Sequence, residues 1–186
     1  MSDVIVVGGD EFAVVEPAVG VLFDARTHGV MPVSMHSANT RGELARFRVV
    51  EGQLLLSDLQ VGSIDTPPPI NGVEAATDEH GQVWTYLGLD LLIDWSGDLI
   101  AGADPILDLY VHAGFLPVWH YERVIAFDVD AGVVRAQEDR SEAVAEFREA
   151  QLDADVTDDD EGIFERFLEA IKLRLGGQHG EHPTQE

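Results

Sequence analysis

The fold is decided by residues 44–59, LARFRVVEGQLLLSDL. In the first half of this stretch, apolar residues recur at every second position: Ala45, Phe47 and Val49. Arginines take the positions between them: Arg46 and Arg48. A two-residue period is typical of a strand with one buried face. Glu51-Gly52 then gives a turn signal and the largely apolar residues 53–59 follow it, so we predict an antiparallel hairpin that turns at Glu51-Gly52.

Further strands are expected on both sides of this hairpin. Residues 4–7 and 11–16 are apolar runs joined by Gly8-Gly9-Asp10, which predicts a second hairpin. Strand-like runs also occur at residues 19–24, 83–93, 99–100, 107–112, 123–129 and 133–135. The string Asp94-Trp95-Ser96-Gly97-Asp98 predicts a hairpin turn into Leu99. Loops are predicted at residues 25–42 and 62–82, where Gly, Pro and Asn interrupt the pattern.

The C-terminal part changes to the helical period. Ser141 is placed to cap a helix that runs through Leu152 and carries Val144 and Phe147 on one side. A second helix is predicted to begin at residues 158–160, where three aspartates meet the positive end of the helix dipole. Its apolar residues share one face: Phe164, Phe167, Leu168, Ile171 and Leu175. We expect this face to pack against the β layer.

These patterns predict an α+β fold, in which a mainly antiparallel β-sheet or open barrel carries two C-terminal helices. Residues 1–175 are expected to form a single domain, with a β-rich part at 1–136 and a helical part at 137–175. Residues 176–186 are polar and are expected to be a flexible tail.

The charge of the chain restricts its partners. Thirty-five Asp and Glu residues stand against eleven Lys and Arg residues, which gives a formal net charge of −24. Such a field repels nucleic acid and anionic membranes, because phosphate binding needs cationic contacts. Three explanations fit: a surface adapted to high salt, the Arg-over-Lys bias of a GC-rich genome, and an acidic face that binds a basic protein partner or mimics DNA.

The cellular compartment is suggested by three further features. The chain has no Cys, its N-terminal residues 1–3 carry no basic group, and no run of 18 apolar residues occurs. We therefore expect a cytoplasmic protein without disulfides, membrane spans or a secretion signal.

One string resembles a known enzyme signature. Residues 8–12, Gly-Gly-Asp-Glu-Phe, match the signature of diguanylate cyclases. In that family a large part of the catalytic domain precedes the signature, whereas seven residues precede it here. The Gly-Gly-Asp turn of the predicted hairpin accounts for the match.

A second resemblance covers roughly residues 8–135. Three segments carry it: residues 36–42, HSANTRG, residues 94–99, DWSGDL, and residues 110–115, YVHAGF. They resemble a family of bacterial proteins with no assigned function. In that family a Ser-Ala-Asn-x-Arg-Gly segment precedes a strand hairpin, and a Trp-Phe-x-Gly-x-Leu segment and a Tyr-Val-His-Met-Gly-Tyr segment follow. The chain departs from that pattern at Ser96 and Ala113, and in its longer helical C-terminus. The resemblance implies a shared fold and brings no activity with it.

The same segments supply the candidate ligand-binding residues: Arg41, Asn39, Asp108, Tyr110 and His112. The last three are two apart, so a strand would place them on one face, where they could bind a polar ligand or transfer a proton. They could equally form a solvated strand face. Arg41 and Asn39 could grip a carboxylate or phosphate, or they could hold the loop in place through hydrogen bonds, which is the role we favour.

Neither a metal nor a cofactor is expected. The seven histidines include no i, i+4 pair of the zinc-protease type, and no phosphate-binding glycine loop or nucleophile elbow occurs. Two functions remain open. One is a non-catalytic acidic binding protein, such as an inhibitor or immunity-type protein. The alternative is a small enzyme or small-ligand-binding protein that uses a polar site on a sheet face.

Overall fold

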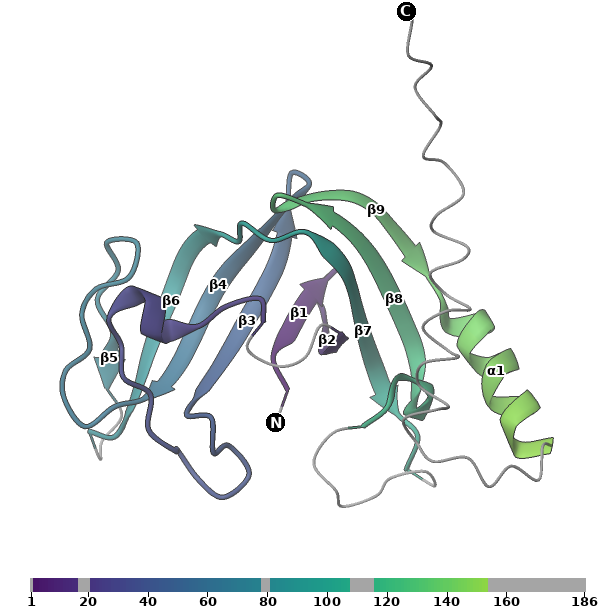
Figure 1. Ribbon diagram of the computed structural model, residues 1–186, viewed down its shortest axis with the longest axis horizontal. Helices are drawn as coiled ribbons and strands as arrows, with labels where there is room; N and C mark the ends of the chain where they lie inside the picture. Colours follow the sequence, from purple (N-terminus) through teal and green to yellow (C-terminus); the bar gives the residue numbers. More distant parts are fainter. Residues whose placement is uncertain (1, 17–20, 78–80, 108–115, 154–186) are drawn as a thin grey trace, which may run out of the picture.

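The computed structural model describes residues 2–16, 21–77, 81–107 and 116–153, and this part of the chain forms nine strands, one α-helix and short 3-10 turns (Figure 1). The strands are β1 Val4–Val7, β2 Asp10–Glu16, β3 Glu43–Val50, β4 Gln53–Gly62, β5 Ala76–Thr77, β6 Val83–Leu92, β7 Gly97–Pro105, β8 Tyr121–Asp130 and β9 Val133–Asp139. The helical elements are η1 Ala25–His28, η3 Val118–His120 and α1 Ser141–Asp153. The predicted β-rich character is confirmed. The second predicted helix lies outside the described residues.

All nine strands belong to one strongly curved sheet. Their order is β3-β1-β2-β7-β8-β9-β4-β6-β5, and β3 also pairs with β4. The sheet is mixed, because β1 and β3 run parallel while the other pairs are antiparallel. It is not a clear barrel. The neighbours β9 and β4 in this order are joined by one residue pair, Val133 with Gln53.

Both hairpins predicted in the first third of the chain are confirmed. Val50 pairs with Gln53 across the turn at Glu51-Gly52, and both turn residues have positive φ, as the favoured two-residue hairpin turn requires. The face assignment is also correct, since Phe47 is fully buried in the main core. The β1–β2 hairpin turns at Gly8-Gly9, again with positive φ at both positions.

The predicted hairpin turn at residues 94–98 is wrong. Strand β6 pairs with β4 and β5, whereas β7 pairs with β2 and β8, so the segment crosses between two parts of the sheet. Backbone hydrogen bonds to two distant segments hold it there: the N–H of Ile93 donates to the carbonyl of Leu54 in β4 at 3.0 Å, and the N–H of Gly132 donates to the carbonyl of Trp95 at 2.9 Å. A turn signal was present, but it does not state which strand comes next to which.

Two smaller predictions also fail, and a third is largely untested. Residues 21–24 are not a strand, because Leu22 and Phe23 leave the sheet and fill the main core from a loop. Of the strand predicted at residues 107–112, only Leu107 is described: it follows the end of β7 at Pro105 and is 80% exposed. Residues 108–112 lie outside the described residues, so most of that strand stays a prediction. The hydroxyl of Ser141 accepts from the N–H of Val124 and donates to Asp139, so it links α1 to β8 instead of capping the helix.

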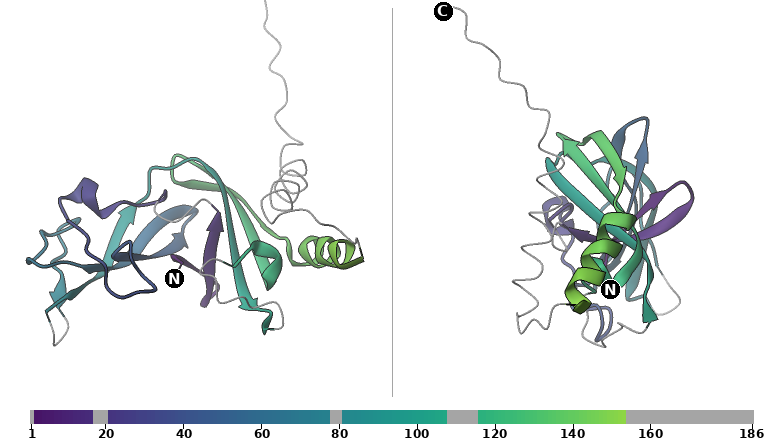
Figure 2. Two further views of the ribbon diagram at one scale, coloured as in Figure 1. Left: turned by 60° about the horizontal axis from the view of Figure 1, so that its bottom comes forward. Right: turned by 90° about the vertical axis from the view of Figure 1, so that its right-hand side faces the viewer.

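The two faces of the sheet have separate cores. The inner face holds the main core, whose largest fully buried side chains include Phe47, Tyr86 and Phe127. On the outer face, α1 packs Val144 and Phe147 against Val124 and its neighbours in β2, β7 and β8. Figure 2 shows α1 at the end of the molecule away from β5 and β6. Among the described helices, none has the length and apolar composition of a membrane span.

Candidate functional site

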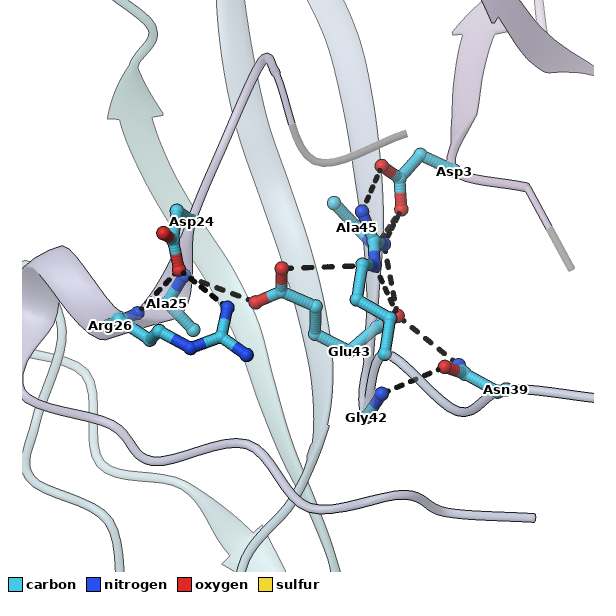
Figure 3. A network of polar contacts seen from close by, with 9 residues as sticks. Asp3, Asp24, Ala25, Arg26, Asn39, Gly42, Glu43 and Ala45 are labelled. Carbon is cyan, nitrogen blue, oxygen red and sulfur yellow. Dashed lines mark hydrogen bonds and ion pairs between the residues drawn. The ribbon is translucent and has the colours of Figure 1, made fainter. Parts of the chain in front are cut away.

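Arg41 lies in a largely buried polar cluster where the chain enters β3, and Figure 3 shows its partners Asp3 and Glu43. Its Nη1 donates to Asp3 Oδ2 at 3.0 Å, and its Nη2 also pairs with Asp3. On the other side, Nη2 donates to the carbonyl of Glu43 at 2.9 Å, and Nε lies 3.7 Å from Glu43 Oε1. The guanidinium is therefore committed to two carboxylates of its own chain, and Asp3 and Glu43 are almost fully buried.

Asn39 closes the turn that precedes β3. Its side-chain carbonyl accepts from the N–H of Gly42 at 3.0 Å, and its Nδ2 donates to the carbonyl of Glu43 at 3.1 Å. Gly42 has φ +80, and a Cβ there would lie 2.3 Å from the carbonyl oxygen of Val33. The contacts of Asn39 and Arg41 are those expected of residues that hold a loop in place.

Two acidic residues of this cluster were missed in the sequence. Glu43 Oε2 accepts from the N–H of Ala25 at 3.0 Å and so ties η1 to β3, while Asp3 Oδ1 accepts from the N–H of Ala45 at 2.9 Å. Burial raises the pKa of the Glu43 carboxyl above its usual value, although the hydrogen bond from Ala25 and the charge of Arg41 act in the opposite direction. A signal for Glu43 existed, because it has the same strand parity as the core residues Ala45 and Phe47.

The remaining candidates, Asp108, Tyr110 and His112, lie outside the described residues. Their role in ligand binding, and with it the small-ligand alternative, stays a prediction. Within the described ranges, no group of three or more His, Asp or Glu side chains is placed to hold a metal ion.

Every arginine in the described part of the chain forms an ion pair or hydrogen bonds with other residues of the same chain. Seven form ion pairs: Arg26 with Asp24, Arg41 with Asp3 and Glu43, Arg46 with Glu11 and Asp58, Arg48 with Asp90, Arg123 with Asp10 and Asp104, Arg135 with Asp130, and Arg140 with Glu138. The other, Arg148, donates to the carbonyls of Trp119 and Tyr121. An incoming anion would have to compete with these partners for each of these guanidinium groups.

Carboxylates, in contrast, are in surplus. Asp98 and Asp128 are direct cross-strand partners in β7 and β8, an arrangement of like charges that destabilises a sheet. Three glutamates project from α1: Glu142, Glu146 and Glu149. The exposed surface of the described residues is therefore rich in carboxylates and poor in available cations.

A groove of about 470 Å³ lies on the outer face of β1, β3, β4 and β6. Apolar side chains from three strands line it: Val4, Leu44 and Leu87. The polar side chains beside them are Glu11, Arg46, Asp58, Gln60 and Thr85. This face is opposite to the main core, because Leu44 and Arg46 alternate with the core residues Ala45 and Phe47.

The structure thus contains two features of interest, a buried cluster that fixes the loop before β3 and an outer groove lined by both apolar and charged side chains. Neither feature can be interpreted by analogy, since no protein-family model, no curated protein and no solved structure matches this chain.

Proposed function

We propose that this protein is a non-catalytic binding protein that recognises a basic protein partner through its acidic surface, in the manner of an inhibitor or immunity-type protein. The observation that carries this proposal is that every described arginine already binds other residues of the chain, whereas carboxylates outnumber the cations that could pair with them. A partner that supplies Lys and Arg side chains would meet acceptors whose charge is not already balanced.

Electrostatics of this kind favours fast and selective association. A net charge of −24 on 186 residues attracts cationic surfaces over distances set by the salt concentration and repels anionic ones. The proposal therefore excludes nucleic acids and anionic membranes as partners and includes basic proteins such as nucleases and toxins. No catalytic step is assigned to the protein.

The test is a capture experiment with the full chain as bait and beads carrying polyglutamate as the control. The proposal predicts a protein of high isoelectric point that is retained in stoichiometric amount by the chain and not by polyglutamate. Retention should decrease as NaCl is raised from about 0.1 M to about 0.5 M, because salt screens surface charges. Equal capture by both kinds of bead would mean that acidity alone is responsible and would contradict the proposal, as would a neutral or acidic stoichiometric partner.

A further inference from the structure

We propose that the outer groove over β1, β3, β4 and β6 is the docking site for a cationic amphipathic helix of the partner protein. This inference rests on the proposed function and adds to it the surface that is used and the chemistry of the segment that it takes. It is carried by the side chains of the groove, by their charges, and by the way in which the neighbouring half of the same sheet face is already covered.

The register of the sheet aligns four of the residues that line the groove. Val4 pairs with Arg46, Arg46 with Asp58, and Asp58 with Leu87, so these four side chains form a row across β1, β3, β4 and β6. Their row is apolar at both ends and charged in the middle. Leu87 is 67% exposed, and it lies in the same groove as the apolar side chains of Val4 and Leu44. An apolar side chain of a partner would remove Leu87 from water.

The charged side chains that line the groove include two carboxylates, of Glu11 and Asp58, and one cation, of Arg46. Arg46 pairs with both Glu11 and Asp58, so two acids share one arginine. Glu11 is the more exposed of the two acids, with 55% of its side chain accessible, compared with 30% for Asp58. A lysine or arginine from a docked helix could contact Glu11 directly, and the negative charge of the whole chain adds to the attraction.

The other half of the outer face shows which kind of element this sheet accepts. There α1 places Val144 and Phe147, three residues apart, against an apolar patch of β2, β7 and β8. Arg148 follows directly and donates to the carbonyls of Trp119 and Tyr121 at 2.9 and 3.1 Å. An apolar pair beside a cation is thus the combination that this sheet face already binds. A helix of the same design would suit the groove, where apolar anchors at i, i+3 and i+4 can enter together.

A segment of the chain itself is the competing occupant. Residues 158–175 are predicted to be an amphipathic helix, but they contain six carboxylates and three cations, Arg166, Lys172 and Arg174. This segment would add negative charge to an acidic groove. Charge complementarity therefore favours a basic helix from another protein.

The test is a titration of the full chain with a labelled 18-residue peptide of Leu and Lys, with leucines at helical i, i+3, i+4 and i+7 positions. Two peptides serve as controls: one of the same composition with the leucines scrambled, and one in which Glu replaces Lys. Leu87→Asp should weaken binding of the Leu/Lys peptide by at least about tenfold, because a charge would then lie at the apolar anchor. The matched control is Leu107→Asp, which adds the same charge at a leucine that is 80% exposed and outside the groove; its effect should be below about twofold.

A second pair of variants changes the groove by one charge. Arg46→Gln releases Glu11 and Asp58 and should strengthen peptide binding at least about threefold more than Arg135→Gln, which makes the same change of net charge at the distant pair with Asp130. A larger gain in peptide affinity for Arg46→Gln than for Arg135→Gln distinguishes binding at the groove from attraction by the net charge of the whole protein.

The proposal is overturned if Leu87→Asp and Leu107→Asp bind the Leu/Lys peptide equally, or if the scrambled peptide binds as tightly as the patterned one. It is also overturned if Phe167→Asp strengthens peptide binding about tenfold, since the groove would then belong to the chain's own C-terminal segment. A captured basic partner that binds Leu87→Asp and wild type equally would refute the groove and leave the proposed function intact. Failure to capture any such partner would refute the proposed function itself.

Discussion

Arg41 donates to Asp3 at 3.0 Å, although the two residues are 38 positions apart in the sequence. Through this contact the beginning of β1 is tied to the beginning of β3, its parallel neighbour in the sheet. Glu43 completes the link by holding η1 through the N–H of Ala25. The cluster thus joins three separate segments of the chain around one guanidinium group.

Removal of this guanidinium should destabilise the fold strongly. Arg41→Ala would leave the buried carboxylates of Asp3 and Glu43 without their cation, which should lower the free energy of unfolding by about 3 kcal/mol. Urea unfolding at neutral pH measures this change. Arg135→Ala is the control, because the pair with Asp130 is exposed and should contribute below about 1 kcal/mol. Equal losses in the two variants would show that the cluster is not a structural link.

The assignment of faces in β3 predicts a second stability difference. Phe47 is fully buried, so Phe47→Ala should lower the free energy of unfolding by about 3–5 kcal/mol through lost contacts and the cavity that remains. Val50, at the end of the same strand, is 37% exposed, and Val50→Ala should cost below about 1 kcal/mol. A loss below about 1 kcal/mol for Phe47→Ala in the same urea series would contradict the burial of this ring.

Glu43 should make stability depend on mildly acidic pH. Its pKa is raised in the folded state by burial, so between the usual value of 4.5 and the raised value the folded protein binds more protons than the unfolded chain. Its contribution to stability therefore increases as pH falls through this window. Between neutral pH and pH 4.5, the free energy of unfolding should increase more in the wild type than in Glu43→Gln, as urea unfolding curves would show. Parallel curves would rule out this role of Glu43.

Asp139 should make stability decrease at more acidic pH, in the direction opposite to Glu43. Hydrogen bonds from the hydroxyl and the N–H of Ser141 lower the pKa of Asp139 below its usual value of 3.8. Its contribution to stability is therefore present above that value and is lost as pH falls through the lowered pKa. Asp139→Asn should lower the free energy of unfolding near neutral pH. On strong acidification this free energy should fall less in the variant than in the wild type, which the same unfolding measurements would reveal. An unchanged acid limb in the variant would contradict this assignment.

Salt should stabilise the protein. With a net charge of −24, repulsion between carboxylates opposes the compact state, and added salt shortens the Debye length from about 30 Å at 0.01 M to about 3 Å at 1 M. The melting temperature should rise over this range. Asp98→Asn should raise the melting temperature at low salt by removing one of two opposed carboxylates, and this gain should shrink at high salt. A flat or falling salt curve for the wild type would remove the self-repulsion argument.

The local parts of this fold were predictable from sequence, and the long-range parts were not. Alternation of Ala45, Phe47 and Val49 identified a strand and its buried face because both properties depend on neighbouring residues. A break between two strands at residues 94–98 was predictable too. The neighbours of β6 and β7 in the sheet, however, are set by pairing with β2, β4 and β8, which no local pattern encodes.

The candidate site shows the same division. The residue types of Asn39 and Arg41 identified them as candidates, and their hydrogen bonds agree with the predicted role of holding the loop in place. Asp3 could not be foreseen as the partner, since a contact over 38 residues has no local signature. The groove was missed for a related reason: Leu44 and Leu87 looked like ordinary strand residues, and only the register of β3, β4 and β6 brings them to one face.

The central claim is that the carboxylate surface binds a basic protein partner, and a calorimetric titration of the purified partner into the full chain tests it most directly. The account predicts saturable binding at a fixed stoichiometry, with an affinity that falls at least about tenfold when NaCl is raised from 0.1 M to 0.5 M, because charges on both surfaces are screened. An affinity that does not change over this salt range would contradict it.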